Sequence, residues 1–71
     1  MLKFAVVGRF VYEVASYNPK TGEMSGRLSY DVWDDHYLGG LDDFVYNEVD
    51  KFFAEREDAR NFCYNQTHFN E

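Results

Sequence analysis

The sequence predicts an α+β fold, in which an antiparallel β-hairpin or three-stranded sheet over residues 2–33 is packed by one long C-terminal helix over residues 42–65. Two patterns carry this prediction. Apolar and polar residues alternate from residue 2 to 17 and again from 24 to 33, as in strands with one buried face. Apolar residues then recur at three- and four-residue spacing from Val45 to Cys63, as in an amphipathic helix. A chain of 71 residues is expected to form one domain over 1–71.

The first predicted strand contains a glycine that has two interpretations. Gly8 is either a bulge in one strand over residues 2–17 or the start of a tight Gly8-Arg9 turn between two shorter strands. We expect the single long strand, because the alternation keeps its phase across Gly8.

The next segment, residues 18–23, has the composition of a turn. Pro19 presets the φ angle of a turn position, and Gly22 accepts a positive φ. A returning strand over residues 24–33 would complete a hairpin.

The helix is predicted to start after a Gly39-Gly40 break. Asp42 and Asp43 follow this break, where a helix N-terminus favours negative charge. Arg56 interrupts the apolar stripe, so its side chain is expected to reach the edge of the stripe, or the helix to kink between Glu55 and Asp58.

Charge is distributed unevenly along the chain, which has a net charge of -6. Residues 1–30 carry four basic and two acidic side chains, whereas residues 31–58 carry ten acidic and two basic ones, a net of -8. Such an acidic segment disfavours direct binding of nucleic acid and favours a basic protein partner. Aromatic residues make up 20% of the chain, more than one small core needs, so some are expected at an interface.

The expected location is the cytoplasm, which would be that of the host cell if a bacteriophage encodes the protein. Cys63 is the only cysteine, which argues against a secreted disulfide scaffold. The N-terminal residues lack the pattern of a signal peptide, and no apolar run approaches the roughly 20 residues that span a bilayer.

No pattern in the sequence predicts enzymatic chemistry, a metal or a cofactor. His36, Cys63 and His68 do not form the closely spaced ligand pairs of a zinc site. Cys63 falls on the predicted core face of the helix, where a thiol is usually inert.

The acidic residues instead predict a binding face for a partner. Asp43, Asp50 and Glu57 are spaced by seven, which on a helix places them in one stripe at roughly 10 Å intervals. Such an array could imitate a row of DNA phosphates, although it could equally be a solvated face that keeps the protein soluble. The predicted partner-binding residues are Asp34, Asp35, Tyr37, Asp43, Tyr46, Asp50, Phe53 and Glu57.

The predicted function is therefore a small acidic protein-binding module. It would inhibit a host protein that handles nucleic acid or serves in defence, as small acidic proteins of bacteriophages and mobile elements do, with a DNA mimic as one form. The alternative is a dimeric protein that binds a nucleotide-like small molecule between Tyr and Phe side chains. A homodimer is expected in either case, because one helix covers only one sheet face and leaves Val7, Val11, Ala15 and Tyr17 on the other.

Overall fold

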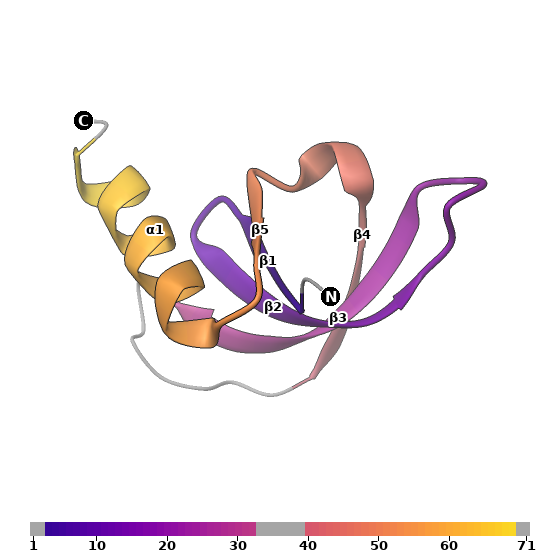
Figure 1. Ribbon diagram of the computed structural model, residues 1–71, viewed down its shortest axis with the longest axis horizontal. Helices are drawn as coiled ribbons and strands as arrows, with labels where there is room; N and C mark the ends of the chain where they lie inside the picture. Colours follow the sequence, from indigo (N-terminus) through magenta and orange to yellow (C-terminus); the bar gives the residue numbers. More distant parts are fainter. Residues whose placement is uncertain (1–2, 33–39, 70–71) are drawn as a thin grey trace.

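The computed structural model describes residues 3–32 and 40–69, which form one five-stranded antiparallel sheet and one C-terminal α-helix (Figure 1). The strand order is β4-β3-β2-β1-β5, so β4 and β5 are the two edges of the sheet. The predicted α+β class and the packing of the sheet by a C-terminal helix are confirmed. The elements are β1 (Phe4–Val7), β2 (Phe10–Tyr17), β3 (Glu23–Asp31), β4 (Leu41–Val45), the 3-10 helix η1 (Tyr46–Glu48), β5 (Lys51–Phe53) and α1 (Arg56–Phe69).

Gly8 and Arg9 form a tight turn between β1 and β2, so the prediction of one long strand is wrong. Gly8 has a φ of 60°, which an L side chain adopts only with strain, and β2 folds back so that Val6 lies opposite Val11. The turn reverses the chain without breaking the alternation of apolar residues. The sequence pattern therefore looks the same for one strand and for two.

The predicted β2–β3 hairpin is confirmed, and its turn is held by local hydrogen bonds. The Asn18 side-chain oxygen accepts from the Lys20 amide at 3.0 Å, and Gly22 has a φ of 80°. Two register shifts follow, at Ala15 in β2 and at Ser29 in β3. Each shift moves the following side chains to the other face of the sheet.

Residues 42–55 are not α-helical, which corrects the N-terminal half of the predicted helix. Phe44 pairs with Met24, and Phe52 pairs with Ala5, so this segment supplies both edges of the sheet with η1 between them. The spacing of Val45, Val49 and Phe52 fits a helix. In the structure, however, Val49 and Phe52 pack against the same core because η1 and β5 place them there. Asp42 and Asp43 are exposed on edge strand β4, where charge discourages pairing with another chain.

The sheet has a hydrophobic core on each of its two faces. We call the face against which α1 packs the outer face and the opposite face the inner face. The inner core is built from Ala5, Tyr12, Met24, Leu28 and Phe44, with Val7, Phe10, Val14, Val49 and Phe52 packed against it. The helix core is built from Val6, Val11, Tyr30, Ala59 and Cys63, with Phe4, Val32, Phe53 and Phe62 packed against it.

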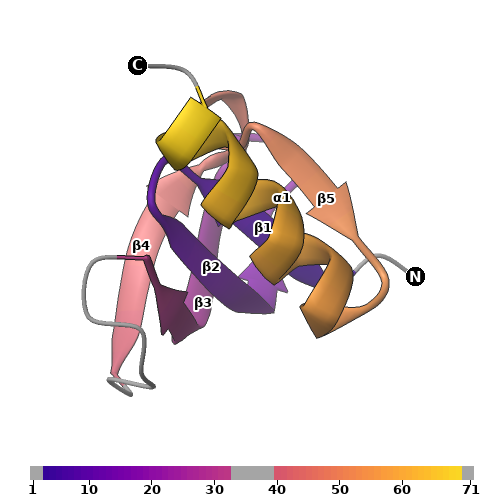
Figure 2. The ribbon, with the colours of Figure 1, turned by 90° about the vertical axis from the view of Figure 1, so that its left-hand side faces the viewer.

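Helix α1 lies across β1 and β2 on the outer face of the sheet, beside β5 (Figure 2). Ala59 and Cys63 are four residues apart on its buried stripe, and both are fully buried. Figure 1 shows α1 at one end of the molecule and the tip of the β2–β3 hairpin at the other. No helix within residues 3–32 and 40–69 is long and apolar enough to cross a membrane.

Candidate functional site

Two half-exposed tyrosines, Tyr17 and Tyr46, lie toward the end of the molecule that carries the tip of the β2–β3 hairpin. Tyr17 is 48% exposed and Tyr46 is 49% exposed, and their ring centroids lie 5.9 Å apart. Tyr46 also contacts Phe52, with centroids 5.5 Å apart. Tyrosines that are this exposed, yet ordered by contact with one another, are typical of protein-binding surfaces.

Local structure explains why these rings meet. The register shift at Ala15 turns Tyr17 toward the inner face, opposite Met24. The Tyr46 amide donates to the Gly22 carbonyl at 2.8 Å, which fastens η1 to the hairpin turn. The fold therefore brings Tyr17 of β2 close to Tyr46 of η1 and Phe52 of β5, which come much later in the sequence.

An apolar hollow of about 510 Å³ lies beside this aromatic group. The Lys3 carbonyl accepts from the Val14 amide, and β1 begins at the next residue, Phe4. β2 continues past Val14 to Tyr17, and this second half of β2 lines the hollow. Its lining residues are Lys3, Val14, Ala15, Ser16, Tyr17, Met24, Tyr46 and Phe52. Lys3 is the single cationic residue among them.

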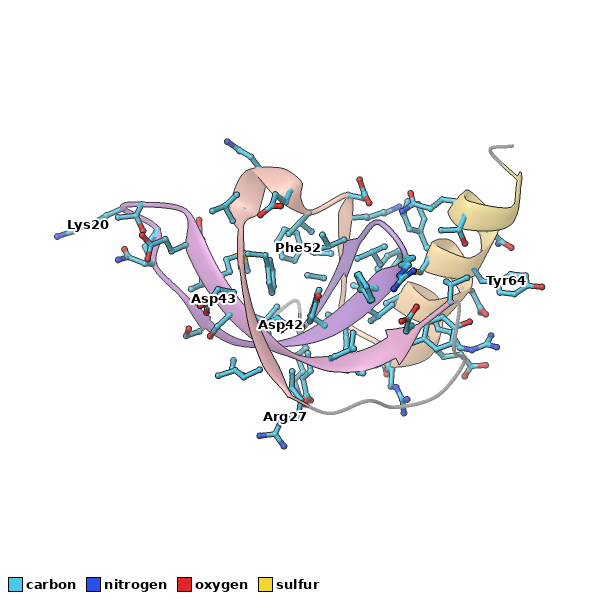
Figure 3. All side chains as sticks on the ribbon, turned by 180° about the vertical axis from the view of Figure 1, so that it is seen from behind. Lys20, Arg27, Asp42, Asp43, Phe52 and Tyr64 are labelled. Atoms are coloured by element: carbon cyan, nitrogen blue, oxygen red, sulfur yellow. The ribbon has the colours of Figure 1, made fainter. Side chains whose placement is uncertain are left out.

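Carboxylates line a second hollow at the same end, of about 590 Å³, which shares Tyr17 and Met24 with the first. Glu23 and Asp43 are exposed, and neither has an ion-pair partner within 4 Å in the described part of the chain. Figure 3 shows Asp43 on the side of β4 that faces the hairpin tip, which Lys20 marks. Glu48 differs because its Oε1 accepts from the Val45 amide at 3.0 Å. We refer to Tyr17, Glu23, Asp43, Val45, Tyr46 and Glu48 as the hairpin end.

The predicted stripe of Asp43, Asp50 and Glu57 does not exist as one helix face. Asp43 lies on β4, Asp50 lies between η1 and β5, and Glu57 lies in the first turn of α1. The spacing of seven has no geometric meaning here, because the first two residues are not helical.

The Asp50 carboxylate is held by hydrogen bonds within the protein. Its Oδ2 accepts from the Gly8 amide and from the Gln66 side-chain amide, each at 2.9 Å. The carboxylate therefore joins the β1–β2 turn to helix α1.

Of the remaining predicted partner-binding residues, Tyr46 and Phe53 lie in different parts of the structure. Tyr46 belongs to the hairpin end, together with Asp43. Phe53 is partly buried in the helix core, where its ring centroid lies 5.5 Å from that of Phe62. Asp34, Asp35 and Tyr37 lie outside the described residues.

The four residues predicted for a dimer interface do not share one face. Val11 is fully buried beneath α1, and Val7 packs against the inner core on the opposite face. The turn at Gly8 causes this difference, because it changes which positions face the helix. Ala15 and Tyr17 are exposed in the second half of β2.

Burial raises the pKa of one titratable side chain in each core, Cys63 in the helix core and Tyr12 in the inner core. Burial raises the pKa of the Cys63 thiol to about 11, and the nearby carboxylates of Asp31 and Asp50 add to this effect. The thiol donates to the Gly8 carbonyl at 3.4 Å. Burial, with a smaller effect from Asp42, raises the pKa of Tyr12 to about 12. Within residues 3–32 and 40–69, no group of three or more His, Cys, Asp or Glu side chains could hold a metal ion.

Sequence reasoning missed Glu23, Val45, Phe52 and Lys3 as members of this surface. Glu23 ends the predicted turn over residues 18–23, but its neighbours on β4 fall in the predicted helix. The β-branched Val45, a poor helix former, is the available signal for strand rather than helix.

Comparison with known proteins adds no assignment: no protein-family model, curated protein or solved structure matches this chain.

Proposed function

We propose that this protein binds a basic surface of another protein through its hairpin end, and that it inhibits a host protein that handles nucleic acid or serves in defence. The observation that carries the proposal is the contact of Tyr17 and Tyr46, both about half exposed, beside the carboxylates of Glu23 and Asp43, which have no ion-pair partner in the described part of the chain. Aromatic anchors supply binding energy at an interface, and the carboxylates select a partner of opposite charge.

The net charge of -6 supports the same class of partner. A negative protein is attracted at long range to proteins that bind nucleic acid, because their surfaces are rich in Lys and Arg. By occupying such a surface, the protein would compete with nucleic acid, which is the sense in which a DNA mimic acts. A bacteriophage or mobile element is the proposed source, and the host cytoplasm the proposed place of action.

The first prediction is that partner capture depends on the hairpin end. Immobilised protein is used to retain proteins from a host lysate, and duplex DNA is added as competitor. Tyr46→Ala should weaken retention by about 2 kcal/mol, or roughly 30-fold, because tyrosine anchors contribute on this scale. The double variant Glu23→Lys, Asp43→Lys should abolish retention, because like charges would then face each other.

The matched control is the double variant Glu55→Lys, Glu57→Lys, which makes the same change of charge at the end of the molecule that carries α1. Retention by the control should stay close to that of the wild type. Equal loss in both double variants would assign the attraction to net charge alone and reject the hairpin end as the site.

The apolar hollow supports a second candidate, a dimeric protein that binds a nucleotide-like small molecule. Its volume of about 510 Å³ lies in the range of ligand pockets, and Tyr17, Tyr46 and Phe52 offer faces for stacking. Lys3 could pair with an anionic group of the ligand. A second copy could attach at Ala15 and Tyr17, which are exposed in the second half of β2.

The second prediction belongs to this candidate. Nucleotides and cyclic nucleotides should raise the melting temperature of the wild type, but not that of Tyr17→Ala or Lys3→Gln. Light scattering on the same samples should give the mass of two chains. If no ligand raises the melting temperature and the mass is that of one chain, this candidate is rejected and the protein-binding proposal is unaffected.

A further inference from the structure

A hollow of about 340 Å³ lies on the outer face of the sheet and shares no residue with the hairpin end. Its lining residues are Phe4, Glu13, Arg27, Ser29 and Arg56. Phe4 lies opposite Glu13, and Glu13 opposite Arg27, so these three side chains form a row across β1, β2 and β3. Arg56 reaches the row from the start of α1.

The two arginines differ in how they are held. The Arg56 Nη2 donates to the Ser29 carbonyl at 2.9 Å, which fixes the guanidinium beside the hollow and leaves its other N–H donors available. Arg27 is exposed and points outward from β3 in Figure 3. Within the described residues it has no ion-pair partner, although Glu13 is its cross-strand neighbour.

Ser29 provides an independent indication that the hollow binds a group. It occupies the register shift in β3, it is only 7% exposed, and its buried hydroxyl has no hydrogen-bond partner among the described residues. A buried hydroxyl without a partner is unfavourable and uncommon in folded proteins. Ser29 is among the residues that line the hollow, so a group bound there is a candidate partner for this hydroxyl.

The chemistry of the lining selects the class of that group. Two guanidinium groups and a hydroxyl are donors for an oxyanion, and arginine matches the two oxygens of a carboxylate with paired hydrogen bonds. Glu13 leaves the lining with a net charge of only +1, which disfavours a doubly charged phosphate. Phe4 adds an apolar wall for the carbon chain next to the carboxylate.

We propose that this hollow binds a carboxylate group, with Arg27 and Arg56 as its guanidinium donors and Ser29 as its hydroxyl donor. The carboxylate can come from a free small acid or from the C-terminus of a peptide. The proposal does not rest on the function proposed for the hairpin end.

The test is a titration followed by amide and arginine side-chain NMR at constant ionic strength. The probes are acetate, a short acetylated peptide with a free C-terminal carboxylate, the same peptide with an amidated C-terminus, and inorganic phosphate. Saturable shifts centred on Ser29, Arg27 and Arg56 are expected for acetate and the free-acid peptide only. Tighter binding of the peptide than of acetate would identify a peptide C-terminus, and equal binding a small acid.

Variants assign the donors. Arg27→Gln and Ser29→Ala should each weaken binding at least tenfold, whereas Lys20→Gln, which removes a charge at the hairpin tip, should leave it unchanged. The Arg27 side chain makes no hydrogen bond or ion pair in the described structure, so its variant is expected to fold normally. Shifts that do not saturate, equal binding of phosphate, or equal weakening by Lys20→Gln would each overturn the proposal.

Discussion

Replacing Gly26 with alanine is expected to lower the free energy of unfolding by about 2 kcal/mol, and replacing it with valine by about 3 kcal/mol or more. Gly26 lies in the middle of β3, between Val14 on β2 and Asp42 on β4. A Cβ atom there would lie 2.9 Å from the Glu13 carbonyl oxygen and 3.0 Å from the Tyr12 Cβ. Both neighbours belong to the paired strand β2, so they cannot withdraw without disturbing the sheet.

The inner core makes this position still less tolerant. The same Cβ would approach the Phe44 ring at 3.3 Å, and that ring is stacked on Tyr12 with centroids 4.9 Å apart. Thermal unfolding measures the effect, and about 2 kcal/mol corresponds to a fall of roughly 10 °C in a domain of this size.

Gly8→Asn is the matched control for Gly26. Gly8 needs a positive φ, which asparagine tolerates, and nothing lies within 4 Å of a Cβ added there. Its variant should therefore melt within a few degrees of the wild type. A Gly26→Ala protein as stable as the wild type would show that β2 and β3 can separate, and that the close approach is not required.

Local chemistry made parts of the fold predictable from the sequence. The turn after Tyr17 follows from Pro19 and Gly22, whose preferences do not depend on distant residues. The second half of the predicted helix follows from Ala59 and Cys63, which lie on one stripe of α1. The same is true of the α+β class, which needs only a hairpin and a helix.

The edge strands were not predictable in the same way, because their partners are distant in the sequence. Phe44 pairs with Met24, and Phe52 with Ala5. β5 has only three residues, and Phe44 is the one buried residue of β4, so neither strand shows a clear alternation. An apolar spacing of four and three then favours a helix when tertiary pairing is unknown.

The same limit applies to the candidate site. Asp43 and Tyr46 were predicted as binding residues on a helix face, yet they meet Tyr17 and Glu23 through the strand pairing and the bond between Tyr46 and Gly22. The register shift at Ala15, which turns Tyr17 inward, involves no glycine or proline and leaves no mark in the sequence. Residues gathered by such features become visible only in the folded chain.

Replacing Asp50 with alanine is expected to lower the free energy of unfolding by about 2 kcal/mol, although this carboxylate is exposed. Its Oδ2 accepts two hydrogen bonds of 2.9 Å, one from the Gly8 amide and one from Gln66. Gln66 also donates to the Gly8 carbonyl at 3.0 Å. The three residues thus form a small network that joins the β1–β2 turn, the segment before β5 and helix α1.

Chemical denaturation of Asp50→Ala, Gln66→Ala and the double variant measures this network as a coupling free energy, expected near 1 kcal/mol because the two side chains share one bond. Hydrogen exchange of the Gly8 amide should accelerate in Asp50→Ala and much less in Gln66→Ala.

Asp43→Lys, at an exposed carboxylate without an ion-pair partner in the described chain, should change stability by less than about 0.5 kcal/mol. If Asp50→Ala behaves like Asp43→Lys, the carboxylate is only a surface charge, and it could then be counted again among residues available to a partner. If it destabilises as expected, any loss of binding in an Asp50 variant must be separated from loss of folding, which is why the hairpin end is tested through Glu23, Asp43 and Tyr46.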